Sequence, residues 1–417
     1  MLKCVATTCC VLLIFMTLYK IWKFFGADEA FSFTAADFKQ LNFHQFRPYP
    51  ISRIDDVEEA RDNQTNSIAI VIIVKAGTSA VQMTIKSIRC YAEVQGYAYF
   101  YIDYSKNVTL QSMCPQEDFL FTRHCVLTDL MKRVTYDWFL FLGDDIGVIN
   151  PVRRLEEFIP AEHTVNLVFY NRFYRDEIMA DSYLIRNTQQ SLEFLTRWAD
   201  YGNNTKDAGC LGTDNGAIQA SGTFAFYMPF PFFSIPGMIF MNIRRNSLIQ
   251  AAILEFFLPA LNRMNSCCQT MWWMGSKYSE LFLYEACAQY LLSQIPKEVL
   301  AQKRLKIYEK GQGWSRDGRM TGSKWCERDL FLQGWKEEKQ NMEWMFPFTS
   351  NKIFDRKCGA GELSRWSYDP RLKVDCLDLD LEMHVLFEET RAKHYQRLQT
   401  LRQMDVFPVK LYEKYGL

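Results

Sequence analysis

Short apolar runs alternate with amphipathic stretches through the first half of the chain. The run at 68–74 (IAIVIIV) is continuous and β-branched, which predicts a strand buried on both faces. Apolar runs at 97–101 and 138–142 predict two more strands, and amphipathic stretches between the strands, one of them at 128–134, predict helices. This alternation predicts an α/β fold with a mostly parallel, Rossmann-like sheet flanked by helices. Such a sheet binds ligands beyond the carboxyl ends of its strands.

Similar patterns continue toward the C-terminus. Apolar segments at 165–170 and 182–185 predict further strands, and 191–201 predicts an amphipathic helix with its large apolar side chains on one face. The segment 384–402 is charged along its length, and we interpret it as a solvated surface helix.

Residues 220–249 fit none of these patterns, because they contain no acidic residue and are crowded with Phe, Met and Pro. A second membrane span agrees with the hydropathy, but Pro229, Pro231 and Pro236 would break its helix. It would also put the two halves of the body in different compartments. We therefore interpret the segment as an inserted loop or as an artefact of the coding sequence, such as a retained intron. Sequencing of the transcript would decide between them.

The N-terminus carries an apolar run from Cys4 to Tyr19 that is followed by Lys20. The run is short of the ~20 residues of a full span, although Lys20 can extend it by snorkelling. A signal anchor and a cleaved signal peptide both fit this pattern. No small-x-small cleavage site follows the apolar core, so we favour an anchor at 1–25. The charges on both sides leave its orientation undetermined.

The rest of the chain divides by composition. Residues 26–66 are polar and aperiodic, which is typical of a stem. The body extends over 67–345, and 346–417 form a C-terminal extension with the charged helix.

Composition favours a lumenal body. The formal net charge is zero, whereas nucleic-acid-binding proteins usually carry a basic excess. Sequons at Asn63, Asn107 and Asn203 and thirteen cysteines indicate an oxidising, glycosylating compartment. Ten of the cysteines lie outside the apolar N-terminal run, an even number that is compatible with disulfides whose pairing cannot be deduced. The lack of CxxC pairs or Cys/His clusters disfavours a zinc site.

The candidate chemistry begins where the strand at 138–142 ends, because Gly143 is followed by two adjacent carboxylates, Asp144 and Asp145. Mg²⁺ and Mn²⁺ prefer oxygen ligands and are commonly held by one or two carboxylates together with substrate phosphates. An acidic pair at the tip of a buried strand therefore suits a metal-bound pyrophosphate. Asp and Gly also dominate turns, so a plain turn is an equally good interpretation of these residues alone.

The segment 139–151 (FLFLGDDIGVINP) resembles the DXD region of glycosyltransferases with the GT-A fold. In particular it resembles a nematode family of secretory proteins, the domain of unknown function 273. That family typically ends the strand with Asp-Ala-Asp before Ile-Gly-Val-x-Asn-Pro. The resemblance makes Asp145 the second acid and places Gly143 where the first acid belongs. Asp144 is a candidate substitute, although adjacent side chains at a strand end tend to point to opposite faces.

The stretch 181–198 (DSYLIRNTQQSLEFLTRW) resembles a Ser-Phe-Leu-Ile-Arg-Asn…Ser-Leu…Leu…Trp stretch of the α-galactosyl/xylosyl/mannosyl-transferase family of fungi and plants. Residues 212–217 (GTDNGA) resemble that family's Asp-Gln-Ser-Ala element. The resemblance implies that Asp214 and Asn215 lie beside the reacting sugar and that Arg186 neutralises a donor phosphate. On the residues alone, Asp214 and Asn215 form an ordinary turn, and Arg186 is equally suited to a structural ion pair.

A third resemblance concerns the segment 333–336 (QGWK). The nematode family shows His-Gly-Trp-Lys there, and related GT-A enzymes use such a His to bind the metal and such a Lys to bind the pyrophosphate. The resemblance therefore assigns Lys336 to the donor and Gln333 to the metal, for which an amide is a poorer ligand than His.

Two further residues attract attention within apolar surroundings. His124, in FTRHC, is similar to the nematode family's pattern, but we interpret it as a satisfied core histidine. Glu285 lies in an apolar segment predicted to be helical. It is either a buried acid with a role or a paired structural carboxylate.

Together the resemblances span residues 68–336 and imply a metal-dependent glycosyltransferase of the Golgi membrane, with a lumenal GT-A domain. It would transfer a hexose, with retention, from a nucleotide-diphosphate sugar to a glycan or glycoprotein acceptor. Mn²⁺ or Mg²⁺ would be held by Asp145, Asp144 and Gln333, and Asp144 would also contact the donor. Two alternatives remain. One is an inactive member that binds a glycan or nucleotide, and the other is a structural protein of the secretory pathway without nucleotide affinity.

Overall fold

The computed structural model describes residues 67–75, 82–173, 175–200, 248–273, 278–335, 345–348, 366 and 368–404. All of them belong to the second of the two units, Met1–Arg61 and Asp62–Leu417, into which the chain divides. The expected anchor, the stem and nearly all of the anomalous segment at 220–249 lie outside the described residues. Within the described residues, no helix is long and apolar enough to cross a membrane.

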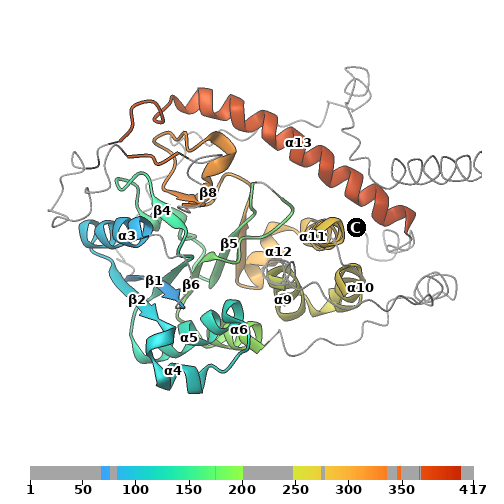
Figure 1. The fold of residues 1–417 in the computed structure, drawn as a ribbon. Helices are drawn as coiled ribbons and strands as arrows, with labels where there is room; N and C mark the ends of the chain where they lie inside the picture. The colour runs from blue at the N-terminus through green and yellow to red at the C-terminus, as the bar shows by residue number, and fades with distance from the viewer. Residues whose placement is uncertain are drawn as a thin grey trace, which may run out of the picture. The chain divides into compact units, whose positions relative to one another are not determined.

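A six-stranded, mostly parallel sheet forms the centre of the described fold (Figure 1). Its strands are β1 (Ile68–Val74), β2 (Ala98–Asp103), β3 (Trp138–Leu142), β5 (Leu167–Tyr170), β6 (Ser182–Arg186) and β7 (Leu305–Tyr308). They lie in the order β2-β1-β3-β6-β5-β7. Strand β6 runs antiparallel to both of its neighbours, and the other pairings in the sheet are parallel. The predicted α/β sheet is therefore confirmed, with one reversed strand.

Strands β1 and β3 are buried along their whole length, and both have the predicted bounds. Their side chains alternate between two apolar clusters because successive residues of a strand face opposite sides of a sheet. Ala69, Val71 and Ile73 join one cluster, whereas Ile70 and Ile72 join the other. A continuous apolar run is thus needed to fill both clusters.

A second, three-stranded sheet covers part of one face. Its strands are β4 (Ile146–Val148), β8 (Ser315–Asp317) and β9 (Phe331–Gln333). In the order β4-β9-β8, β9 lies antiparallel to β4 and parallel to β8. The chain passes from β3 into β4 through Gly143, Asp144 and Asp145, so the acidic pair forms the joint between the two sheets.

Helices cover both faces of the central sheet (Figure 1). The α-helices are α3 (Gln82–Gln95), α4 (Val108–Met113), α5 (Phe119–Arg133), α6 (Gln189–Asp200), α9 (Leu248–Phe257), α10 (Asn262–Trp273), α11 (Tyr278–Ser293), α12 (Lys297–Gln302) and α13 (Cys376–Gln403). In the part of the chain that the structure describes, 3₁₀ turns lie at Tyr104–Lys106, Leu155–Phe158, Pro259–Leu261 and Gly318–Thr321. Helices α5, α6, α9, α10 and α11 contribute to one apolar cluster, and α3 and the second sheet contribute to the other.

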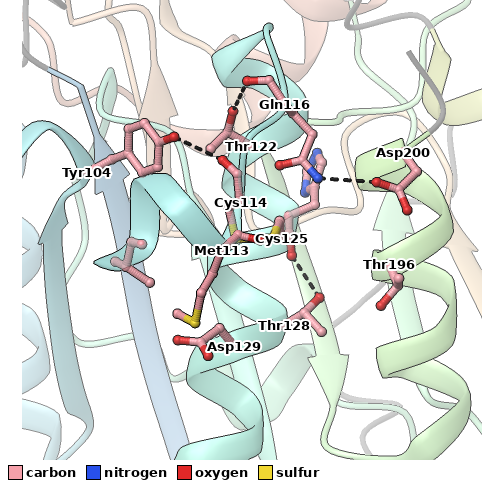
Figure 2. Close-up of a disulfide and its surroundings, with 12 residues drawn as sticks. Tyr104, Met113, Cys114, Gln116, Thr122, Cys125, Thr128, Asp129, Thr196 and Asp200 are labelled. Carbon is pink, nitrogen blue, oxygen red and sulfur yellow. Dashed lines mark hydrogen bonds between the residues drawn. A yellow bond between two sulfur atoms is a disulfide. The ribbon is translucent and has the colours of Figure 1, made fainter. Parts of the chain in front are cut away.

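Helix α5 begins well before the predicted start at residue 128, because Asp118 caps its first turn. A disulfide between Cys114 and Cys125 joins the end of α4 to α5 (Figure 2). The Gln116 side chain also donates a 3.2 Å hydrogen bond to Asp200, the last residue of α6. Three helices are therefore tied together at this corner.

Helix α13 differs from the predicted solvated helix at 384–402. It is 28 residues long and packs along one side against α11 and the 3₁₀ turn Gly318–Thr321. The disulfide between Cys326 and Cys376 fixes its first residue to the body. One face of the helix is consequently a packing surface rather than a solvated one.

Candidate functional site

One edge of the central sheet gathers the candidate chemistry. The register pairs Ile72 with Leu142 and Tyr170 with Tyr308, so β1, β3, β5 and β7 all end at this edge. Because β6 is reversed, its first residue, Ser182, lies opposite Leu142 at the same edge. Parallel sheets bind ligands beyond such carboxyl ends.

Asp145 and Asp181 both lie close to Gly143. The Gly143 amide donates a 2.6 Å hydrogen bond to the Asp181 carbonyl oxygen. A Cβ placed at Gly143 would lie 3.3 Å from the Asp181 Cβ and 3.5 Å from the Asp145 Oδ1. The absence of a side chain at position 143 therefore leaves room for Asp181 beside Asp145.

The turn after β9 fixes the backbone of Asp145. Its carbonyl oxygen accepts hydrogen bonds from the amides of Gly334, at 2.9 Å, and Trp335, at 3.1 Å. Ile146 pairs with Gln333 in the adjoining strands, so the structure brings Gln333 and Asp145 together. Gly334 has φ +100°, a conformation that favours glycine at this turn.

Gly147 and Trp335 form a second close contact that holds this turn. The Trp335 ring is fully buried, and a Cβ at Gly147 would lie 2.7 Å from three of its atoms. Only glycine leaves room for the indole there. The Ile-Gly-Val and Gln-Gly-Trp segments of the sequence are therefore two halves of one packing arrangement.

Asp144 contacts helix α3 through its backbone. Its carbonyl oxygen accepts a 2.5 Å hydrogen bond from the Thr84 hydroxyl of α3. Burial raises the pKa of Tyr101 in β2, and the Asp103 and Asp144 carboxylates raise it further against the opposing effect of Lys106.

The loop between β5 and β6 carries buried charges into the same edge. Arg172 pairs with Asp317 of β8 and, at 3.2 Å, with Glu177. Arg123 of α5 pairs with Asp181 at 2.6 Å. Unlike charges thus alternate from α5 through the loop to the second sheet.

These contacts shift the titration of two buried acids. Burial raises the pKa of the Glu177 carboxyl, and the nearby Asp181 and Asp317 raise it further against the opposing effect of Arg172. Burial also acts to raise the pKa of Asp317, but the Arg172 guanidinium outweighs it and the pKa falls below its usual range. The loop therefore concentrates negative charge that the arginines balance.

Helix α13 and β7 reach the other end of this loop. Asp176 pairs with His394 at 3.0 Å and with Arg397 at 2.8 Å, both from α13. The Lys310 ammonium, just beyond β7, donates to the carbonyl oxygens of Arg172, at 3.1 Å, and Arg175. The C-terminal helix thereby anchors the loop that carries Arg172 and Asp181.

The structure separates Arg186 from the other predicted site residues. Arg186 does stand at a strand's end, but β6 is reversed, and Arg186 pairs with Trp138 at the opposite edge of the sheet. Its guanidinium donates a 2.6 Å hydrogen bond to the His163 carbonyl oxygen. The expectation that Arg186 would lie with the acidic pair is therefore wrong, because strand direction is not visible in the apolar pattern. Asp214, Asn215 and Lys336 lie outside the described residues.

His124 and Glu285 are both buried. The His124 Nδ1 lies 2.8 Å from the Tyr183 hydroxyl, and its ring stacks on Trp198 at 3.5 Å. Burial lowers its pKa well below the usual value, which fits the predicted core histidine. Glu285 is completely buried 3.9 Å from Arg175, which favours the paired structural carboxylate.

Sequence reasoning missed Asp181, Arg123, Arg172 and Lys310. Asp181 immediately precedes an apolar run, and an antiparallel assignment of that run would have placed it at the ligand-binding edge. Nothing in the local sequence marks the other three, because each acts through a partner distant in the chain.

A divalent cation would find a limited donor set at this edge. In the described part of the chain, no three His, Cys, Asp or Glu side chains are grouped closely enough to hold a metal ion. Two acidic residues, Asp145 and Asp181, nevertheless lie close to Gly143, and Gln333 pairs with Ile146, the residue after Asp145. Such a set matches the one or two carboxylates that hold Mg²⁺ together with substrate phosphates. The residues present therefore fit a cation that is completed by substrate oxygens.

Comparison with known proteins places the chain in a family. The family model described as "Protein of unknown function, DUF273" matches residues 88–227 and 234–347, which is more than half of the chain. No curated protein matches the sequence.

Two solved glycosyltransferases are similar to the chain in structure. One, involved in the glycosylation of the major capsid of PBCV-1, is 14% identical, with a TM-score of 0.28, over 37% of this chain and 74% of its own. The other, GlyE of Streptococcus pneumoniae TIGR4, is 12% identical, with a TM-score of 0.24, over 60% of this chain and 81% of its own. At these TM-scores the similarity carries no argument about activity.

Proposed function

The chain belongs to the DUF273 family, and we propose that this member is a glycosyltransferase of the GT-A kind. It would transfer a hexose from a nucleotide-diphosphate sugar to a glycan or glycoprotein acceptor, with retention of configuration. The resemblance of 139–151 and 181–198 to glycosyltransferase motifs motivates this proposal. These two segments are β3 with its acidic end and β6 with its leading acid, and they are adjacent strands in the sheet.

One observation carries the proposal. Asp145 is set at the carboxyl end of β3, its carbonyl is held by two amides of the turn after β9, and its carboxylate lies beside the Gly143–Asp181 contact. A carboxylate fixed this way on two sheets is preorganised, because its backbone cannot move without breaking the second sheet. That is the property expected of a residue that positions a diphosphate.

Charge at this edge suits a diphosphate leaving group. We propose that Asp145, Asp181 and Gln333 hold Mn²⁺ or Mg²⁺, which when bound supplies positive charge that stabilises the departing diphosphate. Lys336 directly follows the turn that holds Asp145, and we propose that it binds the pyrophosphate. Asp144 is proposed to contact the nucleoside portion of the donor rather than the metal.

The buried loop between β5 and β6 keeps these groups in position. Arg123 orients the Asp181 carboxylate through its 2.6 Å ion pair, and Lys310 fixes the loop backbone at Arg172 and Arg175. Asp214 and Asn215 are proposed to contact the reacting sugar on the basis of the sequence resemblance alone. Arg186 has no part in this proposal, because it lies at the other edge of the sheet.

Several features support a secretory location. Disulfides join Cys114 with Cys125, Cys268 with Cys287, and Cys326 with Cys376, and such bonds persist in oxidising compartments. The sequon residue Asn107 is exposed at the start of α4. We therefore propose a lumenal enzyme of the Golgi membrane, held by an anchor at 1–25.

A catalytically inactive, ligand-binding protein is the second candidate. Gly143 and Gln333 stand where the family typically has an acid and a histidine, and Asp181 is already neutralised by Arg123. This candidate predicts nucleotide binding without transfer, and without a requirement for manganese.

Thermal unfolding of the full chain tests both candidates. A nucleotide at a hundred times its dissociation constant adds about 2.7 kcal/mol to the free energy of unfolding. We expect UDP or GDP to stabilise the native chain only when Mn²⁺ is present, and Asp145→Asn to abolish the effect. Asp129→Asn, at an exposed ion pair on α5, is the control that should behave like the native chain. Stabilisation without Mn²⁺ would favour the inactive candidate, and no stabilisation by any nucleotide would reject both.

A further inference from the structure

Helix α13 presents large apolar side chains to solvent on the face away from the body. Leu377, Leu381, Val385 and Tyr395 are 60%, 62%, 59% and 52% exposed. The first three are spaced by four residues, and Tyr395 lies five helical turns beyond Leu377. The four side chains therefore form one stripe along the helix, which we call the α13 stripe. Figure 1 shows this long helix lying along the outside of the described fold.

Charge is completely segregated along the same helix. Its first half, residues 376–390, contains no Lys or Arg, and its second half, residues 391–403, contains no Asp or Glu. The acids are Asp378, Asp380, Glu382, Glu388 and Glu389, and the bases are Arg391, Lys393, Arg397 and Arg402. The helix is therefore acidic at its start and basic at its end.

Packing against the body uses only part of these charges. Asp380 pairs with Arg328, Glu382 with Lys324, and Arg397 with Asp176. The remaining charges include Asp378, Glu389, Lys393 and Arg402, all of which are exposed. The segregated pattern therefore extends to the solvent-facing side of the helix, where the α13 stripe lies.

We propose that two copies of this chain associate through their α13 helices, packed antiparallel around a two-fold axis. An antiparallel pair places the acidic half of each helix against the basic half of the other, whereas a parallel pair places like charges together. The α13 stripes then overlap at Val385 and Tyr395 and remove these apolar side chains from water.

The symmetry of the pair fixes which residues meet. If the helices cross near residue 391, Glu389 of one copy lies beside Lys393 of the second copy, and the reverse contact forms on the other side of the axis. Val385 then comes within about one helical turn of the second copy's Tyr395. The crossing thus brings exposed unlike charges together and lets the two stripes overlap at Val385 and Tyr395, whereas Leu377 and Leu381 lie toward the end of the second copy's helix.

Charge reversal of this pair tests the proposal by sedimentation equilibrium of the full chain. We expect the native chain to show a concentration-dependent dimer. Glu389→Lys and Lys393→Glu should each raise the dissociation constant at least tenfold, because each places like charges together. An equimolar mixture of the two single variants should restore the native dissociation constant, because every contact in the mixed pair is again between unlike charges.

Other occupants of the α13 stripe give different results. A native chain that stays monomeric at all concentrations, or single variants that dimerise as well as the native chain, would overturn the proposal. Val385→Glu, measured at a protein concentration where the native chain is monomeric, separates the remaining case. It should leave the melting temperature unchanged if a second copy covers the stripe. If another segment of the same chain covers the stripe, the variant should have a lower melting temperature, and the chain should always be monomeric. None of these outcomes depends on nucleotide binding.

Discussion

The amide of Gly143 donates a 2.6 Å hydrogen bond to the carbonyl oxygen of Asp181, and the Asp181 side chain lies next to the space that a side chain at position 143 would occupy. The acid that the family typically carries at position 143 is absent here, yet a carboxylate from the neighbouring strand stands beside the same site. Strand β6 thus places the side chain of Asp181 close to position 143, where β3 lacks an acid.

We predict that Asp181→Asn removes the manganese-dependent stabilisation by nucleotide, because an amide cannot replace the carboxylate as an anionic ligand. The double variant Gly143→Asp with Asp181→Gly moves the carboxylate to the neighbouring strand. It should recover part of the stabilisation in thermal unfolding with Mn²⁺ and UDP or GDP. Recovery by the double variant but not by Asp181→Gly alone would support exchange of the acid between strands. An equal loss of the nucleotide-dependent stabilisation in Asp181→Gly and in the double variant would contradict this exchange.

Gly143→Asp alone should lower the stability of the chain. Its Cβ would lie 3.3 Å from the Asp181 Cβ, so the Asp181 side chain must give by a few tenths of an ångström. Overpacking of this kind costs about 1–3 kcal/mol. Urea unfolding of Gly143→Asp, of Asp181→Gly and of the double variant would show whether the cost comes from the crowded aspartate. If it does, the double variant loses less stability than the two single variants together, although Asp181→Gly also breaks the ion pair with Arg123.

Some of these features could be predicted from the sequence, and the reason is physical. Strands β1 and β3 have the predicted bounds because a β-branched apolar run has few other ways to bury both faces. The acidic joint at Asp144 and Asp145 follows directly from the end of such a run. The direction of a strand cannot be predicted this way, because an apolar run is buried equally well whether it runs parallel or antiparallel to its neighbours. The sequence therefore could not show that β6 is reversed, and it misled us about Arg186.

The buried charges were hidden for another reason. Arg172 pairs with a residue 145 positions away, and Asp176 pairs with Arg397 at a separation of 221. Isolated charges in a loop are usually solvated, so nothing local distinguishes these from surface residues. The charged helix α13 was likewise predicted to be solvated, although one of its faces supplies the partners of Asp176.

Gly147→Ala should destabilise the chain more than most single substitutions. The new methyl group would lie 2.7 Å from the ring of Trp335, which is fully buried and whose backbone amide donates a hydrogen bond to Asp145. We expect a loss of about 3 kcal/mol in the free energy of unfolding, at the upper end of overpacking costs. Trp335→Leu should make the same substitution less costly, and a double-mutant cycle by urea unfolding measures this coupling. Purely additive effects would contradict the contact.

Two disulfides should differ in their effect on stability because they close loops of different length. Cys326 and Cys376 are 50 residues apart, whereas Cys114 and Cys125 are 11 apart. Loop-closure entropy predicts losses of about 4 and about 3 kcal/mol when each pair is changed to serine. Urea unfolding of the two double-serine variants gives the comparison. A larger loss at Cys114–Cys125 would show that contacts at that corner, rather than loop length, decide the outcome.

Lys310 should make the stability of the chain depend on pH in a narrow alkaline window. Burial lowers the pKa of its ammonium from 10.5 to about 8, although Asp176 opposes this effect. Between pH 8 and pH 10.5, Lys310 holds its proton in the unfolded chain but has released it in the folded chain. The free energy of unfolding therefore rises as pH increases through the window, by at most ~1.4 kcal/mol per pH unit.

Below pH 8 Lys310 is protonated in both states, so the full cost of burying its charge is present there. Lys310→Met should abolish the rise between pH 8 and 9.5, even though it also removes the hydrogen bonds to the carbonyls of Arg172 and Arg175. The exposed Lys303→Met serves as the matched control and should retain it. Urea unfolding at half-unit steps of pH measures each slope. A native slope that Lys310→Met leaves unchanged would mean that another group releases the proton, and that Lys310 stays charged against the loop it holds.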